Sequence, residues 1–280
     1  MSGAGKLVLI GTPLGNRGDL SPRARAALLE ADLLLCEDTR SPQRLLPDAT
    51  LPERHSCFVA NEHDRIALLL ERLAAGQVVA FVSEAGLPVW SDPGRLLVAA
   101  AVEAGFGIDV IPGPTAGTCA LAASGFLAEG ARFLGFIPRA GAERTAVLDT
   151  LAESEGASIL YEAGNRTPTL LRDLAKRCPD RRVLIARELT KLHQEFIRGS
   201  ASELAESQTK PLRGEVTVVL DGQPKAEAEA AAEPTQAAAQ AVLELMLDAS
   251  LKPRARAKAL AKLTGHDPRE LYTRLAGNKP

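Results

Sequence analysis

Two clusters of charged residues stand at the ends of apolar runs that are typical of buried strands. They comprise Glu37, Asp38 and Arg40 in the first cluster and Arg187, Glu188 and Lys191 in the second. A carboxylate at a strand end can accept a proton, and a lysine can position an anionic group or, with a lowered pKa, assist deprotonation. The alternatives are a solvated ion-pair cluster and an ordinary solvated lysine. The catalytic candidates are Asp38, Arg40, Glu188 and Lys191.

A loop rich in glycine and proline, Ser83–Gly94, directly follows the apolar run Val78–Val82. Glycine permits left-handed or closely approaching backbone, and proline fixes φ and removes a donor, so the loop can form a rigid wall against a ligand. The alternative is an ordinary tight connection between a strand and a helix. Three further loops of this kind, which can line the same cleft, are Gly11–Asn16, Pro112–Thr118 and Tyr161–Arg166.

These loops do not carry the usual phosphate-binding signatures. Gly11–Asn16 matches neither the P-loop nor the dinucleotide pattern, and Pro13 removes a backbone donor that a phosphate would need. ATP, GTP and NAD are therefore disfavoured. S-adenosylmethionine suits such a cleft better, because its adenine can pair with backbone groups and its sulfonium needs no arginine. Methyl transfer then depends mainly on positioning, with a base to take the acceptor's proton.

Short strands alternate with helices in the first half of the chain. The expected strands are Leu7–Ile10, Leu33–Cys36, Val78–Val82 and Ile108–Ile111. The expected helices start at Ser21-Pro22, cover Asn61 to Ala75 with a stop at Gly76, and run from Asp92-Pro93 to near Gly105. This alternation predicts a mainly parallel sheet covered by helices.

The second half is expected to form a mixed sheet. Its expected strands are Phe133–Phe136, Ile159–Tyr161, Val183–Ala186, Glu195–Arg198 and Val216–Leu220, and its expected helices are Glu143–Glu153 and Pro168–Arg177. The short gap between the third and fourth strands indicates an antiparallel hairpin.

The chain is therefore expected to contain two α/β domains and a small helical module. The domains cover residues 1–111 and 112–223, a linker rich in alanine and glutamate covers 224–240, and the module covers 241–280. The expected helices of the module are Ala241–Asp248, Pro253–Leu263 and Pro268–Ala276. Its basic residues, which are typical of a nucleic-acid reader, are Lys252, Arg254, Arg256, Lys258 and Lys262. The alternative is a solvated helix pair that docks on the body.

The composition is that of an ordinary globular protein. The chain has 280 residues, of which 46% are hydrophobic and 24% charged. Its net charge of −2 indicates binding neither to nucleic acid nor to a membrane. No signal peptide or membrane span is visible, which predicts a cytoplasmic protein. The four cysteines and four histidines lack metal-binding spacing, so neither a metal nor a disulfide is expected.

Eight segments of the chain, in order, resemble the tetrapyrrole methylase superfamily, and within it the small-subunit ribosomal RNA methyltransferase I branch. They are Leu9–Asn16 with Asp19-Leu20-Ser21, Ala31-Asp32 to Glu37–Arg40, Ser83–Gly94, Pro112–Ala116, Phe133–Arg139, Tyr161-Glu162, Ala186–Lys191 and Gly214-Glu215. Together they cover nearly the whole chain. The resemblance implies two α/β domains with S-adenosylmethionine bound between them, and a homodimer. It also implies 2′-O-methylation of a cytidine ribose in the decoding region of 16S rRNA.

The resemblance also assigns residues by position. Those implied for the cofactor are Pro13, Gly86, Leu87, Ser91, Asp92, Thr115, Ala116, Tyr161, Glu162 and Leu189. Asp92 and Thr115 have the alternative of capping a helix. Arg139 and Arg144 are expected to contact RNA phosphates, together with the basic residues of the helical module.

Three positions depart from the family pattern: Glu84 stands where Asp is usual, Leu87 where Thr is usual, and Asn165 where His is usual. Leu87 lacks a hydroxyl, and Asn165 cannot act as an acid or base. Two alternatives follow: a paralogue that methylates a tetrapyrrole or another small molecule, and a non-catalytic relative that binds RNA or the ribosome.

Overall fold

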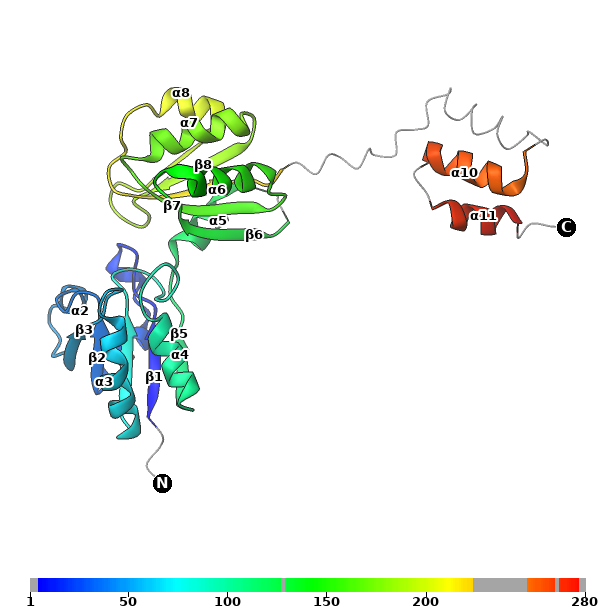
Figure 1. The fold of residues 1–280 in the computed structure, drawn as a ribbon. Coiled ribbons are helices and arrows are strands. Elements are labelled where there is room, and N and C mark those ends of the chain that lie inside the picture. Colours follow the sequence, from blue (N-terminus) through cyan, green and yellow to red (C-terminus); the bar gives the residue numbers. More distant parts are fainter. Residues whose placement is uncertain (1–4, 127–128, 224–250, 265–266, 277–280) are drawn as a thin grey trace. The chain divides into compact units, whose positions relative to one another are not determined.

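The computed structural model describes residues 5–126, 129–223, 251–264 and 267–276. The chain divides into two compact units, Met1–Pro224 and Lys225–Pro280. The first unit contains two five-stranded sheets, one formed within residues 6–111 and the other within residues 131–220 (Figure 1). The expected α/β architecture, with a parallel sheet followed by a mixed one, is confirmed.

The first sheet is parallel throughout, in the order β3-β2-β4-β1-β5. Its strands are β1 (Lys6–Ile10), β2 (Leu33–Cys36), β3 (Glu53–Ser56), β4 (Val78–Val82) and β5 (Gly107–Ile111). Four of them lie within one residue of their predicted positions, because buried parallel strands are continuous apolar runs. The fifth, β3, was not predicted. It is a polar edge strand with no buried residue, so it carries no hydrophobic signal.

Helices cover both faces of this sheet, and the element η1 (Arg17–Asp19) precedes them. They are α1 (Pro22–Glu30), α2 (Ser41–Leu45), α3 (Glu62–Ala74) and α4 (Arg95–Glu103). The expected start of α1 is confirmed, since the Ser21 side chain accepts a hydrogen bond from the Ala24 N–H. The helix predicted to open at Asp92 instead begins at Arg95, and Gly94 is its N-cap.

The second sheet has the order β6-β7-β10-β8-β9, in which only β6 and β7 are parallel. Its strands are β6 (Ala131–Phe136), β7 (Ala157–Ala163), β8 (Arg182–Arg187), β9 (Glu195–Ser200) and β10 (Glu215–Leu220). The predicted hairpin is confirmed by the antiparallel pairing of β8 with β9. The helices are α5 (Ala116–Ser124), α6 (Gly141–Glu153), α7 (Thr167–Arg177) and α8 (Ala201–Ser207).

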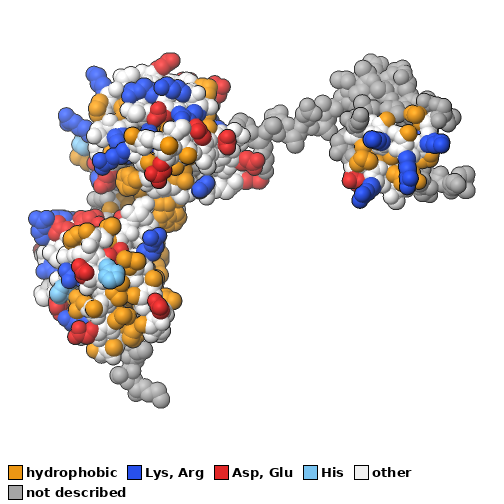
Figure 2. All heavy atoms as spheres, in the orientation of Figure 1, with side chains coloured by type: hydrophobic (Ala, Val, Ile, Leu, Met, Phe, Trp, Pro, Cys, Tyr) orange, Lys and Arg blue, Asp and Glu red, His pale blue; other side chains and the backbone are white. Residues whose placement is uncertain are grey.

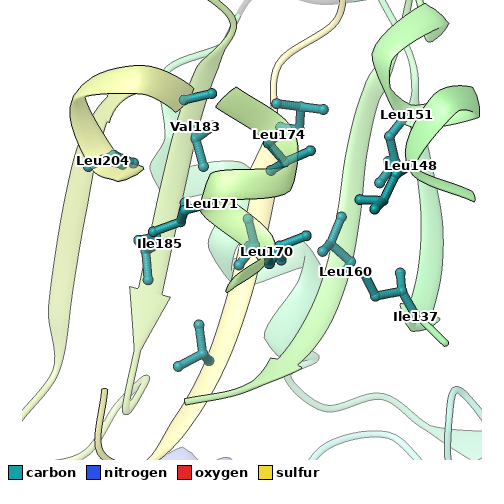
Figure 3. Close-up of a cluster of buried hydrophobic side chains, with 14 residues drawn as sticks. Ile137, Leu148, Leu151, Leu160, Leu170, Leu171, Leu174, Val183, Ile185 and Leu204 are labelled. Atoms are coloured by element: carbon teal, nitrogen blue, oxygen red, sulfur yellow. The ribbon is translucent and has the colours of Figure 1, made fainter. Parts of the chain in front are cut away.

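Each sheet of the first unit is buried on both faces. In the second sheet, α6, α7 and α8 pack on one face, where leucines of α7 meet Leu160 of β7 and Ile185 of β8 (Figure 3). On the opposite face, α5 packs on Ile159, Leu184 and Val219. Each large apolar side chain buried in this way contributes about 1.5–3 kcal/mol. The two sheets thus form rigid supports for the loops at their ends.

The described part of the second unit contains α10 (Pro253–Thr264) and α11 (Pro268–Ala276). Ala257 and Leu260 of α10 are buried, and the Arg254 guanidinium lies 5.5 Å from the ring centre of Tyr272 in α11. Lys252, Arg254 and Lys258 are exposed, and Arg256 is half-buried. Figure 2 shows Lys and Arg side chains on the visible face of this unit. The expected linker, the expected helix Ala241–Asp248 and the Lys262 side chain lie outside the described residues.

Candidate active site

Three loops at the ends of β1, β4 and β5 are joined by backbone hydrogen bonds. The N–H of Thr12 donates to the Gly86 carbonyl at 2.9 Å, and the N–H of Gly86 donates back at 3.0 Å. The N–H of Leu87 donates to the Pro114 carbonyl at 3.1 Å. A Cβ added at Gly11 would lie 2.5 Å from Gly113, so only glycine allows this approach. The loops predicted to line one cleft therefore do meet.

A cavity of about 450 Å³ lies among these loops and the edge of the second sheet. Its lining residues are Leu14, Glu84, Ala85, Gly86, Leu87, Trp90, Ser91, Asp92, Thr115, Ala116, Phe136, Tyr161, Glu162, Ala163, Gly164, Gly214, Glu215, Val216 and Thr217. Four of these residues are carboxylic acids, and the set includes no Lys, Arg or His. Such a lining favours a cationic ligand over a phosphate.

The loop Ser83–Gly94 holds an unusual backbone. Besides Gly86 and Gly94, the non-glycine residues Val89 and Ser91 have positive φ values of 81° and 68°. Such conformations cost energy and persist where surrounding contacts enforce them, often at ligand sites. The wall predicted from glycine and proline is present, with additional strain at Val89 and Ser91.

Asp92 is a half-buried carboxyl group in the cavity wall. Burial and the nearby Glu37 carboxylate raise its pKa to about 6, against a smaller opposing effect of the Ser83 hydroxyl. The alternative role as a helix cap is wrong, because Gly94 is the N-cap of α4. Instead, Glu62 of α3 accepts the N–H groups of Gly94 and Leu96 at this helix end, at 3.0 and 2.6 Å.

Asp38 and Arg40, two of the catalytic candidates, lie beside the cavity and do not line it. Asp38 holds Arg40 through paired hydrogen bonds, and these bonds keep the Asp38 pKa well below its usual range. The Asp38 N–H donates to Glu84 at 3.1 Å, and the Ser41 hydroxyl donates to the same carboxylate. This cluster therefore anchors Glu84, which does line the cavity.

The other two candidates, Glu188 and Lys191, form a second cluster next to the cavity. The Lys191 ammonium lies 3.1 Å from Glu188 and 3.0 Å from Glu215. Burial lowers the Lys191 pKa, but hydrogen bonds to the two carboxylates outweigh it, so the net shift is upward. A lysine held protonated cannot take a proton from an acceptor. The upward shift of its pKa argues against the base role of Lys191 and favours its alternative role of positioning an anionic group.

Eight of the ten residues implied for the cofactor line the cavity: Gly86, Leu87, Ser91, Asp92, Thr115, Ala116, Tyr161 and Glu162. Thr115 is also the N-cap of α5, since its hydroxyl accepts the Thr118 N–H. Pro13 and Leu189 do not line it: Pro13 borders a smaller neighbouring cavity, and Leu189 is buried in the core beside α5. Of the family departures, Glu84 and Leu87 reach the cavity, and Asn165 is exposed outside it.

The position of Arg144 differs from the sequence-based expectation that it contacts an RNA phosphate. Its side chain is buried and donates to Asp173 at 2.9 Å and to the Pro138 carbonyl at 2.9 Å. The guanidinium is therefore enclosed within the second half and is not presented to an RNA phosphate. Arg139, the other arginine expected to contact phosphate, is exposed.

Several residues that line the cavity were not among the site residues predicted from the sequence. The most prominent are Trp90 and Phe136, whose side chains line the cavity and remain 47% and 62% exposed. Both stand in segments that carry the family resemblance, but an aromatic residue in a strand or loop is ordinarily core. Val216 and Thr217 were predicted as the start of a strand, and Gly214-Glu215 as a segment of the family resemblance, without any role in the site.

Comparison with known proteins agrees with this architecture. Residues 6–205 match the family model of the tetrapyrrole (corrin/porphyrin) methylases. The ribosomal RNA small subunit methyltransferase I of Thermotoga maritima is 44% identical over 222 residues, which are 78% of this chain and 99% of the relative. The chain belongs to this methyltransferase family. The protein of that name from Streptococcus pyogenes is 34% identical over 272 residues, 96% of this chain and 94% of its own.

Solved structures show the same fold. The uroporphyrin-III C-methyltransferase of Thermus thermophilus, complexed with S-adenosylhomocysteine, superposes with a TM-score of 0.55. It is 20% identical, and the match covers 76% of this chain and 96% of that one.

S-adenosylmethionine is the cofactor, and the cavity fits it. The volume lies within the usual range for small-molecule sites. The four carboxylates suit a positively charged sulfonium. The Glu162 side chain is fully buried: Arg166 pairs with its Oε1, and its Oε2 lies 3.9 Å from the Arg144 guanidinium and accepts no hydrogen bond from the described residues. Among those residues, no group of His, Cys, Asp and Glu is arranged to hold a metal ion.

Proposed function

We propose that this enzyme methylates the 2′-hydroxyl of a cytidine in the decoding region of 16S rRNA. The observation that carries the proposal is the similarity to ribosomal RNA small subunit methyltransferase I over almost the whole chain of the Streptococcus pyogenes relative. That similarity extends beyond the two sheets into the basic helical module. The solved tetrapyrrole methylases share only the fold at this level of identity, so they do not favour a small-molecule acceptor.

When bound, S-adenosylmethionine supplies an electrophilic methyl carbon to an attacking oxygen. The residues of the chain position the acceptor and receive its proton. Asp92 is the side chain best suited to accept that proton, because it lines the cavity and has a pKa of about 6. Such a group is mostly ionised at neutral pH and is a stronger base than an ordinary aspartate. Glu84, anchored by Ser41 and Asp38, keeps the opposite part of the loop in place.

Exposed cations outside the cavity supply the RNA contacts. Arg139 follows β6, Lys252 directly precedes α10, and Arg254 and Lys258 lie on α10. These side chains would bind phosphates without reading sequence, so they set affinity and its dependence on salt.

The test is a comparison of 16S rRNA from a strain lacking the gene with rRNA from its parent. Loss of one cytidine 2′-O-methyl group in the decoding region, restored by the wild-type gene, is the expected result. Purified enzyme with radiolabelled S-adenosylmethionine should methylate subunits or rRNA from the deletion strain and leave parental rRNA unlabelled. Identical methylation maps in the two strains would refute the proposal.

We further propose that the enzyme works in the cytoplasm as a homodimer, as the family resemblance implies. Among the described helices, none combines the length and apolar character needed to cross a bilayer. Light scattering after size exclusion should give a mass of twice 29.6 kDa. A monomeric mass throughout the working concentration range would exclude the dimer.

A further inference from the structure

Four aromatic rings form a continuous cluster beside the cofactor cavity, although the chain has only ten Phe, Tyr and Trp residues. Trp90 and Phe133 meet edge to face with centroids 4.9 Å apart. Phe133 meets Tyr161 at 5.0 Å, and Tyr161 meets Phe136 at 5.6 Å. Edge-to-face contacts hold each ring in a defined orientation. The cluster joins the loop after β4 to strands β6 and β7.

A β-bulge in β6 turns two of these rings to the same face. Phe133 pairs with Ile159 and Phe136 pairs with Tyr161, while the register shifts between Phe133 and Gly135. Ile159 and Tyr161 are two residues apart and share one face of β7, so Phe133 and Phe136 share the corresponding face of β6. Without the bulge, residues three apart would point to opposite faces. Bulges commonly re-aim a side chain at a functional site.

The bulge depends on Gly135. Its φ is +64°, and a Cβ there would lie 2.7 Å from the Ser91 hydroxyl oxygen. Glycine therefore lets the strained loop Ser83–Gly94 lie against β6 at the point where Phe136 turns toward the cavity. The backbone of both elements is adapted to hold these rings in place.

Phe136 and Trp90 have large exposed fractions for aromatic residues, 62% and 47%, although both line the cavity. Exposing rings of this size loses the stabilisation that burial would bring. Tyr161 is more buried, and burial raises the pKa of its hydroxyl. The cavity therefore has a rim with two exposed aromatic side chains.

We propose that Phe136, linked to Trp90 through Tyr161 and Phe133, is a stacking platform for the base of the acceptor nucleotide. This inference rests on the proposed function and adds how the substrate is held. Single-stranded RNA is commonly bound by splaying a base out and stacking it on an aromatic side chain. The lining contains no Lys, Arg or His to hold a phosphate, so the uncharged base and ribose are the parts of a nucleotide that suit it.

The test measures kcat/KM for the RNA substrate and the Kd for S-adenosylmethionine separately in three variants, Phe136→Ala, Phe136→Leu and Phe136→Tyr. The expected result is a loss of about 5- to 150-fold in kcat/KM for the RNA substrate in the Ala and Leu variants, the range for one stacked base. Phe136→Tyr keeps an aromatic face and should restore activity to within about threefold. The Kd for S-adenosylmethionine, measured by calorimetry, should stay within about twofold in all three variants.

A second readout does not depend on turnover. Trp90 is the only tryptophan of the chain, so intrinsic fluorescence reports on the platform directly. Titration with a short RNA carrying the target cytidine, in the presence of S-adenosylhomocysteine, should quench the wild-type signal. The Phe136→Ala variant should need a correspondingly higher RNA concentration. Phe58→Ala is the matched control, because Phe58 is 43% exposed and does not line this cavity.

The outcomes separate the two proposals. If wild-type enzyme methylates the RNA and Phe136→Ala does so equally well, the stacking platform is refuted and the proposed function stands. If Phe136→Ala weakens S-adenosylmethionine and leaves the KM for RNA unchanged, the ring belongs to the cofactor and the platform is again refuted. If the wild-type enzyme methylates no small-subunit RNA, the proposed function falls and the platform falls with it.

Discussion

Replacing Glu62 should loosen the cofactor site from a position outside it. Glu62 is the first residue of α3, only 5% exposed, and its Oε1 accepts the N–H groups of Gly94, Leu96 and Leu97 at 3.0, 2.6 and 3.4 Å. It therefore caps α4 from another helix and holds the end of the loop that carries Asp92. A carboxylate at a helix N-terminus also interacts favourably with the helix dipole.

The size of the expected destabilisation follows from the two shorter hydrogen bonds, those from Gly94 and Leu96. A hydrogen bond to a charged group contributes about 1.5–3 kcal/mol, so Glu62→Ala should reduce the free energy of unfolding by about 3–6 kcal/mol. Glu62→Gln keeps an oxygen at the Oε1 position, and a neutral bond contributes about 0.5–1.5 kcal/mol. Two such neutral bonds contribute about 1–3 kcal/mol in place of about 3–6, so the Gln variant should lose only about 2–3 kcal/mol.

Urea denaturation gives the free energies, and calorimetry gives the Kd for S-adenosylmethionine. We expect the Ala variant to bind the cofactor at least about tenfold more weakly. The binding free energy must then also order the loop, and a cost of about 1.4 kcal/mol for that ordering raises the Kd tenfold. Glu71→Ala, an exposed change on the same helix, is the control and should fall within about 0.5 kcal/mol of wild type. An Ala variant as stable as this control, with unchanged cofactor affinity, would show that the cap does not organise the loop.

Three further predictions concern the cavity, the core and the helical module. Asp92 is ionised above its pKa of about 6 and protonated below it, so kcat/KM should fall as the pH is lowered through about 6. Asp92→Asn should abolish that acidic limb in a pH–rate profile and lower kcat by about 10²–10⁴. Arg144→Met removes the partner of Asp173 and a cation 3.9 Å from the fully buried Glu162 carboxylate, so thermal and urea denaturation should show a loss of about 3–5 kcal/mol with no change in the salt dependence of RNA binding. Glutamine at three exposed cations of the helical module should weaken RNA binding and reduce the slope of log K against log salt by about 2 while sparing cofactor affinity; the positions are Lys252, directly before α10, and Arg254 and Lys258 on it.

Most strands could be predicted because a buried strand is a continuous run of apolar residues in the sequence. The runs at β2 and β4 are apolar throughout, and a helix-covered parallel strand requires that pattern. The polar edge strand β3 and the helix α5, whose sequence of small residues has no strong periodicity, carry no comparable signal. Both were missed for that reason.

The cavity was harder to predict because its geometry depends on contacts between distant residues. Asp92 has the type and position of a helix cap, yet Glu62, thirty residues earlier, performs that role. Phe133 and Phe136 are three residues apart, and only the bulge places them on one face. Nothing in the sequence distinguishes Arg144 from a surface arginine, because its partner Asp173 is 29 residues away and meets it only in the fold. Each correction comes from tertiary contacts that override a local pattern.

The distribution of charge links the cofactor and the proposed substrate. The cavity lining presents carboxylates and no Lys, Arg or His, so it suits a cationic sulfonium and offers no cation to hold the phosphates of RNA. One site therefore cannot serve both partners through charge. The phosphates must be bound by cations outside the cavity, such as Arg139 and the exposed residues of α10, and the uncharged base and ribose must enter. An aromatic rim at Phe136 and Trp90 is the surface that this division of tasks requires, since stacking holds a base without any positive charge near the sulfonium.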